Sequence, residues 1–169
     1  MRQIFLILFF ISTFICASFA AEKHHTKFIK NFERWRVFEK NKTKECVIIS
    51  EPVYSNGFAG FRDIPHVMFT LIKGKKLTFS NYSGFIINKQ QAIQVFVGEK
   101  RFLLKSYRDF FAFTYDSDDD VELVNILLKN RDNIQVRSVN KDLEVANDYY
   151  EFKGLDKAFE FVKNNSNCN

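Results

Sequence analysis

The sequence predicts a mainly β fold: an antiparallel β-sandwich of immunoglobulin-like or jelly-roll type, with one internal helix and one C-terminal helix. Most of the chain consists of short runs in which apolar and polar residues alternate, separated by polar or glycine-containing turns. Only two segments have helical spacing, and many strands with two helices favour an antiparallel architecture. We expect a single domain over residues 32–169.

Residues 1–20 have the pattern of a secretory signal peptide. Arg2 precedes an apolar run over residues 4–15, and small residues end the segment. We expect cleavage between Ala20 and Ala21. A retained anchor is the alternative, but the run is too short to span a bilayer comfortably. After cleavage the chain is not expected to be an integral membrane protein, because no later apolar run reaches about 18 residues.

Two cysteines, Cys46 and Cys168, remain after the expected cleavage. An even pair in an oxidising compartment is most simply a structural disulfide. A redox-active pair, the alternative, needs close spacing such as C-x-x-C, which is absent. Export predicts the periplasm as the location, with the outer surface or the medium as alternatives.

The elements are predicted in chain order as follows. Residues 21–31 are polar and basic and are expected to form a flexible leader. Residues 32–38 and 46–50 predict a strand hairpin, and 51–64 a long connection with proline and glycine. Further strands are predicted at 66–72, 77–80, 84–87, 92–97, 101–104, 110–114, 134–139 and from 143 onward.

Two helices complete the prediction. Val121, Val124 and Leu127 recur at helical spacing behind an acidic segment, which indicates an internal helix. The C-terminal helix follows Gly154, and its apolar face is formed by Leu155, Ala158, Phe159 and Val162.

The acidic residues Asp116 and Asp118–Asp120 suggest either a calcium site or a helix N-terminus. An EF-hand loop that starts at Asp116 needs glycine at Val121 and glutamate at Leu127, and neither is present. Carboxylates also favour the positive end of a helix. We therefore favour helix capping and expect no metal.

The histidines offer little for metal binding or catalysis. His24 would chelate copper or nickel only if cleavage followed Ala21, and Phe19 then occupies a position that the peptidase prefers small. His25 adds nothing beyond that possibility. His66 lies in an apolar strand and is expected to be structural.

No catalytic constellation stands out. With one internal histidine and no free mature thiol, Cys–His catalysis is excluded and a Ser–His–Asp triad is poorly supported. A carboxylate pair stays open as an alternative. We expect a non-enzymatic protein without a cofactor.

The net charge of +5 comes from basic residues that are interspersed along the chain, without the dense basic stripe of a nucleic-acid binder. Trp35 is expected in the core together with one of the neighbouring pair Tyr149–Tyr150, since alternation along a strand buries one of the two; an aromatic ligand surface is the alternative.

Several segments, in this order and spacing, resemble the invasion-associated locus B family of exported alphaproteobacterial proteins. They are Trp35–Val37, the cysteine strand Cys46–Pro52, Arg62–Val67, Ser83–Phe85 and Asp148–Leu155, followed by Ala158 and Cys168. The resemblance covers nearly the whole mature chain. It implies a periplasmic or outer-surface β-sandwich with a packed helix, and it brings no catalytic or binding residues.

The expected function is therefore the binding of a protein or envelope component without catalysis. A small apolar-ligand carrier is the first alternative, because the many phenylalanines could line a pocket with a few polar groups. An envelope hydrolase with paired carboxylates is the second, and it requires two acids with perturbed pKa values in one cleft.

Overall fold

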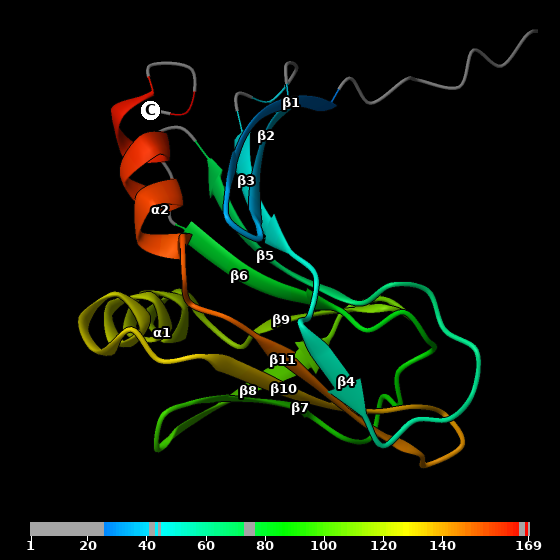
Figure 1. Ribbon diagram of the computed structural model, residues 1–169. Helices are drawn as coiled ribbons and strands as arrows, with labels where there is room; N and C mark the ends of the chain where they lie inside the picture. The colour runs from blue at the N-terminus through cyan, green and yellow to red at the C-terminus, as the bar shows by residue number, and fades with distance from the viewer. Residues whose placement is uncertain (1–25, 41–42, 44, 73–76, 166–167, 169) are drawn as a thin grey trace, which may run out of the picture.

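The computed structural model describes residues 26–40, 43, 45–72, 77–165 and 168 (Figure 1). The expected signal peptide, the cleavage position between Ala20 and Ala21, and His24 and His25 lie outside the described residues. Within these ranges the chain is mainly antiparallel β with one internal and one C-terminal helix, as predicted. No helix in these ranges is both long and apolar enough to cross a membrane.

The described residues form eleven strands and two helices. The strands are β1 Thr26–Phe32, β2 Trp35–Lys40, β3 Glu45–Ser50, β4 Tyr54–Asn56, β5 His66–Ile72, β6 Leu77–Tyr82, β7 Ile93–Val97, β8 Lys100–Ser106, β9 Phe111–Thr114, β10 Ile134–Val139 and β11 Val145–Tyr150. The helices are α1 Ser117–Asn130 and α2 Leu155–Asn164.

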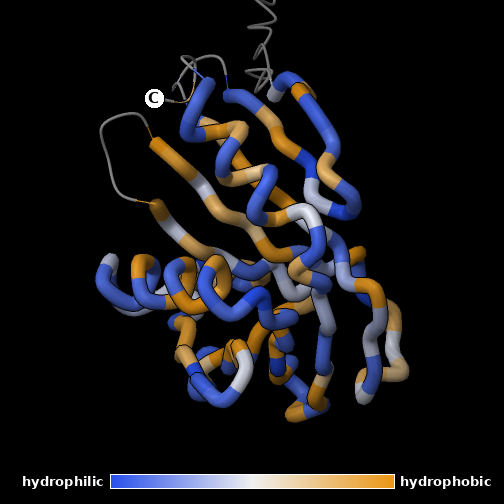
Figure 2. Tube along the Cα trace, turned by 60° about the vertical axis from the view of Figure 1, so that its left-hand side comes forward, coloured by the Kyte–Doolittle hydropathy of each residue, from blue (hydrophilic) through white to orange (hydrophobic). Residues whose placement is uncertain are grey.

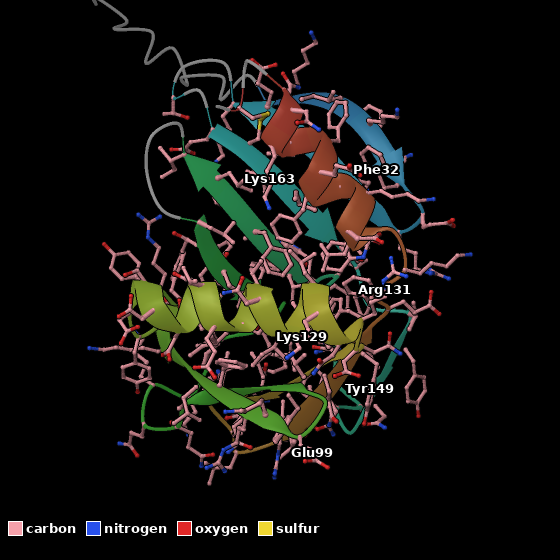
Figure 3. All side chains as sticks on the ribbon, turned by 90° about the vertical axis from the view of Figure 1, so that its left-hand side faces the viewer. Phe32, Glu99, Lys129, Arg131, Tyr149 and Lys163 are labelled. Atoms are coloured by element: carbon pink, nitrogen blue, oxygen red, sulfur yellow. A yellow bond between two sulfur atoms is a disulfide. The ribbon has the colours of Figure 1, made fainter. Side chains whose placement is uncertain are left out.

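All described strands belong to one antiparallel sheet with the order β1-β2-β3-β5-β6-β9-β8-β7-β10-β11-β4. Figure 1 shows that this sheet bends sharply, so that β1, β2, β3, β5 and β6 form an upper half and the remaining strands a lower half. Both helices lie on the same side of the sheet, and in Figure 3 α1 crosses the middle while α2 stands above it. The result is a sandwich-like arrangement with the helices on its inner side.

The core lies between the inner sheet face and the helices. Along β5, Val67 and Phe69 are buried while their neighbours are only half-buried, the period-two alternation expected of a strand. Figure 2 shows apolar and polar residues interspersed along the chain. The largest fully buried side chains are Trp35, Tyr150, Phe69, Phe79, Ile48, Ile87, Ile93, Leu104, Leu123, Leu127, Ile134 and Leu155.

Helix α1 starts at an acidic cap. The Asp116 carboxylate accepts hydrogen bonds from the backbone N–H groups of Asp118 and Asp119, both at 2.9 Å. These bonds satisfy donors that have no partner inside the helix. Helix capping, which we favoured over calcium for this segment, is therefore the role of Asp116.

Helix α2 requires the glycine that precedes it. Gly154 has φ +94°, and a Cβ atom there would lie 2.3 Å from the backbone oxygen of Phe32 at the end of β1. A side chain is therefore excluded by both conformation and space. The Phe32 ring in turn packs on Phe161 of the helix, with ring centroids 5.4 Å apart.

The disulfide is the one predicted. Cys46 on β3 and Cys168 beyond α2 are bonded, with Cα atoms 5.3 Å apart and 122 positions between them in sequence. Figure 3 shows the two sulfur atoms near the end of α2. The bridge fastens the C-terminal helix to the upper half of the sheet.

Four predicted elements differ from the structure. Strand β1, Thr26–Phe32, lies largely inside the segment that was expected to be a flexible leader. Most of its side chains are exposed, and it is a strand because its backbone pairs with β2. The single strand expected at 32–38 is interrupted by a turn in which Glu33 has φ +57°. The connection 51–64 contains β4, which pairs with β11. Residues 84–87 contribute only an isolated bridge, Ile87 to Asn140.

Candidate binding groove on the outer sheet face

Most residues singled out in the sequence have structural roles. Trp35 is fully buried, and its Nε1 donates to the backbone oxygen of Glu151 at 3.0 Å. Tyr150 is also fully buried, and burial raises its pKa well above the ordinary value. Tyr149 points to the outer face, where its ring lies 5.6 Å from that of Tyr54. Trp35 is therefore in the core, and of the tyrosine pair only Tyr150 is, as strand alternation predicts.

The acidic segment is built into the fold. Asp120 is buried, and its Oδ1 accepts from the backbone N–H of Phe79 at 2.7 Å and from Thr114 Oγ1 at 2.6 Å. Burial raises the pKa of Asp120, while these two hydrogen bonds lower it. Burial also raises the pKa of Asp119, with a further contribution from the charge of Asp116. Asp120 thus joins α1 to β6 and β9.

His66 lies on the outer face of β5. Its ring stacks on that of Tyr82, with centroids 4.7 Å apart, and its Nδ1 is 3.3 Å from the backbone oxygen of Ile64. Burial lowers its pKa, which favours the neutral ring. No three His, Cys, Asp or Glu side chains in the described ranges converge as metal ligands would.

The outer sheet face, from the upper half across to β9, is hollowed into an apolar groove of about 540 Å³. Its lining comes from six strands and from the turn between β8 and β9, on the side of the sheet away from α2. The lining residues are Thr26, Phe38, Lys40, Val47, Ile49, Met68, Thr70, Ser80, Tyr107, Arg108, Phe111 and Phe113.

The strand register explains the floor of this groove. Ile49 lies opposite Met68, Met68 opposite Ser80, and Ser80 opposite Phe113, so one continuous row crosses β3, β5, β6 and β9. Opposed side chains in antiparallel strands share one face, so this row presents a largely apolar surface. The adjacent row is Phe38, Val47 and Thr70.

Aromatic side chains form the walls. On one side the Tyr107 ring meets that of Phe113 edge-on, with centroids 5.9 Å apart. On the other side Phe38 lines the groove, and the Phe28 ring of β1, which lies outside the lining, meets it edge-on with centroids 5.6 Å apart. Tyr107 is mostly exposed, so its wall offers apolar area to a bound molecule.

The lining of the groove carries two cations and no carboxylate. Lys40 Nζ is 3.1 Å from Glu45 Oε2, so its charge is partly compensated. The Arg108 guanidinium lies 5.9 Å from the centre of the Tyr107 ring, and no ion pair is found for it in the described part of the chain. The groove therefore combines an apolar floor with an uncompensated positive charge beside one wall.

Sequence reasoning missed this groove. The signal was present in the run Cys46–Ile49, where both faces of one strand are apolar. The structure shows that Val47 and Ile49 line the groove while Cys46 and Ile48 enter the core.

Fold and site together define a mainly antiparallel β protein with two helices, a long-range disulfide and an open apolar groove. Comparisons with protein-family models, with curated proteins and with solved structures find no match for this chain. The functional conclusion therefore depends on the groove itself.

Proposed function

We propose that this protein is an exported, non-enzymatic binding protein whose groove holds an amphiphile with one apolar chain and an anionic head group. The groove supports this proposal most directly: its volume of about 540 Å³ falls within the range of small-molecule sites, and apolar side chains dominate its lining. Amphiphiles of this kind are components of cell envelopes. The proposal therefore narrows the expected binding of an envelope component to one class of ligand, and it agrees with the alternative of a small apolar-ligand carrier.

Charge complementarity selects the head group. Among the described residues, no carboxylate pairs with Arg108 of the lining, and a guanidinium binds carboxylate or phosphate oxygens through two parallel hydrogen bonds. A cationic amphiphile would meet Arg108 and Lys40 without any acidic side chain in the lining to compensate it.

Export and family membership are part of the proposal. The signal-like segment 1–20 motivates export, and the Cys46–Cys168 bridge supports it because disulfides persist mainly in oxidising compartments. The resemblance to the invasion-associated locus B family agrees with a periplasmic location. Intact mass of the protein recovered from its producing cells tests export: cleavage before Ala21 is expected, and an uncleaved chain contradicts it.

Calorimetric titration with dodecanoate below its micellar concentration tests the binding function. We expect saturable one-to-one binding of dodecanoate and much weaker binding of dodecyltrimethylammonium, which has the same chain and the opposite charge. Thr70→Trp fills the floor and should abolish binding, whereas Val121→Trp, a matched substitution on exposed α1 surface, should not. Arg108→Gln should weaken dodecanoate about tenfold, equal to about 1.4 kcal/mol. Equal affinity for both amphiphiles, or binding unaffected by Thr70→Trp, refutes the proposal.

A further inference from the structure

The lower half of the sheet has its own outer face, separate from the groove. One row of directly opposed residues crosses five strands: Arg101 on β8, Phe96 on β7, Gln135 on β10, Tyr149 on β11 and Tyr54 on β4. Neighbouring strands lie about 4.8 Å apart, so this row extends over roughly 19 Å. It places two polar donors and three aromatic rings on one surface.

A second row runs beside the first. Leu103, Gln94, Arg137, Asn147 and Asn56 are opposed across the same five strands. Leu103 and Arg137 are exposed, and the other three are half-buried. We call these ten residues the amide–arginine face, since four amides and two arginines supply its polar groups.

The polar groups of this face are largely uncommitted. Asn147 Nδ2 donates to Asn56 Oδ1 at 3.0 Å, which fixes one end of the second row. For the side chains of Arg101, Arg137, Gln94 and Gln135, the described residues provide no hydrogen-bond or ion-pair partner. None of the ten positions is Asp or Glu. The face therefore offers guanidinium and amide groups without an internal counter-charge.

We propose that the amide–arginine face binds an extended anionic polysaccharide. Each amide supplies a donor and an acceptor, which matches the hydroxyl groups of a sugar. The two guanidinium groups match carboxylates repeated along the chain. Tyr54 and Tyr149, held in contact with each other, offer apolar ring area at one end of the row. The length of the rows, roughly 19 Å, suits a chain of several sugars.

The other polyanionic partners fit this face less well. A nucleic-acid surface requires a denser run of cations and more aromatic rings for base stacking than these ten residues provide. A membrane surface would be contacted best by protruding apolar side chains, whereas the polar residues Gln135 and Arg137 occupy the middle of the two rows. Preferential binding of this face to a nucleic acid or to a membrane surface would therefore contradict the proposal.

Affinity electrophoresis of the folded protein through gels that contain polygalacturonate or alginate tests the proposal. We expect retardation in at least one polymer, loss of retardation with added salt, and little retardation by fully methyl-esterified polygalacturonate, which lacks the charge. The double substitution Arg101→Gln, Arg137→Gln should weaken binding at least tenfold. Gln94→Ala with Gln135→Ala should weaken it several-fold without changing net charge.

Controls separate this face from general charge effects and from the groove. Lys129→Gln together with Lys100→Gln removes the same charge from α1 and from the first residue of β8, whose Nζ lies 3.4 Å from Glu122 of α1, and should change binding less than twofold. Lys129 is labelled on the helix side in Figure 3. Thr70→Trp, which fills the groove, should leave polysaccharide binding intact. No retardation in either polymer, equal losses in the two double arginine and lysine variants, or tighter binding to oligo-thymidine or to phosphatidylglycerol vesicles overturns the proposal.

Discussion

Arg62 and Asp148, which lie 86 positions apart in sequence, form a bidentate ion pair inside the lower half of the molecule. Arg62 Nη1 donates to Asp148 Oδ2 at 3.2 Å and Nη2 donates to Oδ1. The Asp148 side chain is fully buried and that of Arg62 is 11% exposed. Ser55 Oγ also donates to Asp148 Oδ1, at 2.7 Å. The pair therefore anchors the connection between β4 and β5 to β11.

Removing one partner of this pair should be costly. Arg62→Met leaves the buried carboxylate with Ser55 as its remaining side-chain donor, and we expect a loss of about 3–5 kcal/mol in the free energy of unfolding. The double variant Arg62→Met, Asp148→Leu removes both charges and should recover much of that loss. Urea unfolding followed by the emission of Trp35 measures both. A loss below about 1 kcal/mol for Arg62→Met would show that the ion pair does not anchor this connection.

The disulfide should contribute strongly to stability. The bridge closes a loop of 122 positions, and the chain-entropy model assigns such a loop on the order of 5 kcal/mol as an upper value. We expect the Cys46→Ala, Cys168→Ala variant to unfold at markedly lower urea concentration than the oxidised protein. The reduced wild type should behave like the variant. Equal unfolding midpoints for oxidised and reduced protein would contradict a stabilising role.

Asp120 should make stability depend on its acceptor atoms and on pH. Asp120→Ala leaves the buried N–H of Phe79 without a partner and should cost about 1–3 kcal/mol, whereas Asp120→Asn keeps an acceptor and should cost less.

The same carboxyl should make stability depend on pH. Because burial raises the folded pKa of Asp120, the carboxyl contributes most stability below its ordinary pKa near 3.8, and this contribution is lost as pH rises through the folded value. Thermal melts between pH 3.5 and 7 should show this decline in the wild type and not in Asp120→Asn.

His66 should make the stability of the fold depend on pH in the opposite sense to Asp120. Burial lowers its folded pKa, so its contribution to stability is present above the unfolded value near 6.5 and is lost as pH falls below that value through the folded pKa. His66→Gln should remove this part of the pH dependence. Nuclear magnetic resonance titration of the imidazole provides the folded pKa directly. Parallel loss of stability in wild type and variant between pH 7 and 5 would assign the effect to other groups.

The fold was predictable because its signals are local. Val67 and Phe69 alternate with half-buried neighbours, and the apolar face of α2 recurs at helical spacing, so burial could be inferred within single elements. The cysteine pair followed from counting. Strand β1 was missed because its side chains are mostly exposed and its stability comes from pairing with β2. Strand β4 is three residues long, too short for periodicity to show.

Beyond the two-sided apolar run Cys46–Ile49, the outlines of the candidate sites could not be predicted, because they depend on register across strands. Ile49, Met68 and Phe113 come from three separate segments, and only their alignment creates the groove floor. The sequence does not show whether an apolar side chain on the outer face, such as that of Val47, is covered by other residues or lines an open groove. The role of the acidic segment 116–120 could be predicted from sequence, because Asp116 caps the helix through the backbone N–H groups of residues only two and three positions further on.

The most direct test of the proposed function is a map of backbone amide shifts during titration with dodecanoate. We predict the largest changes at Val47, Ile49, Met68 and Phe113, with a separate effect at Arg108 that is absent when dodecanol replaces dodecanoate. Residues on the exposed surface of α1 should not shift. Shifts confined to α1, or no saturable shifts at all, would show that the groove is not a binding site for an anionic amphiphile.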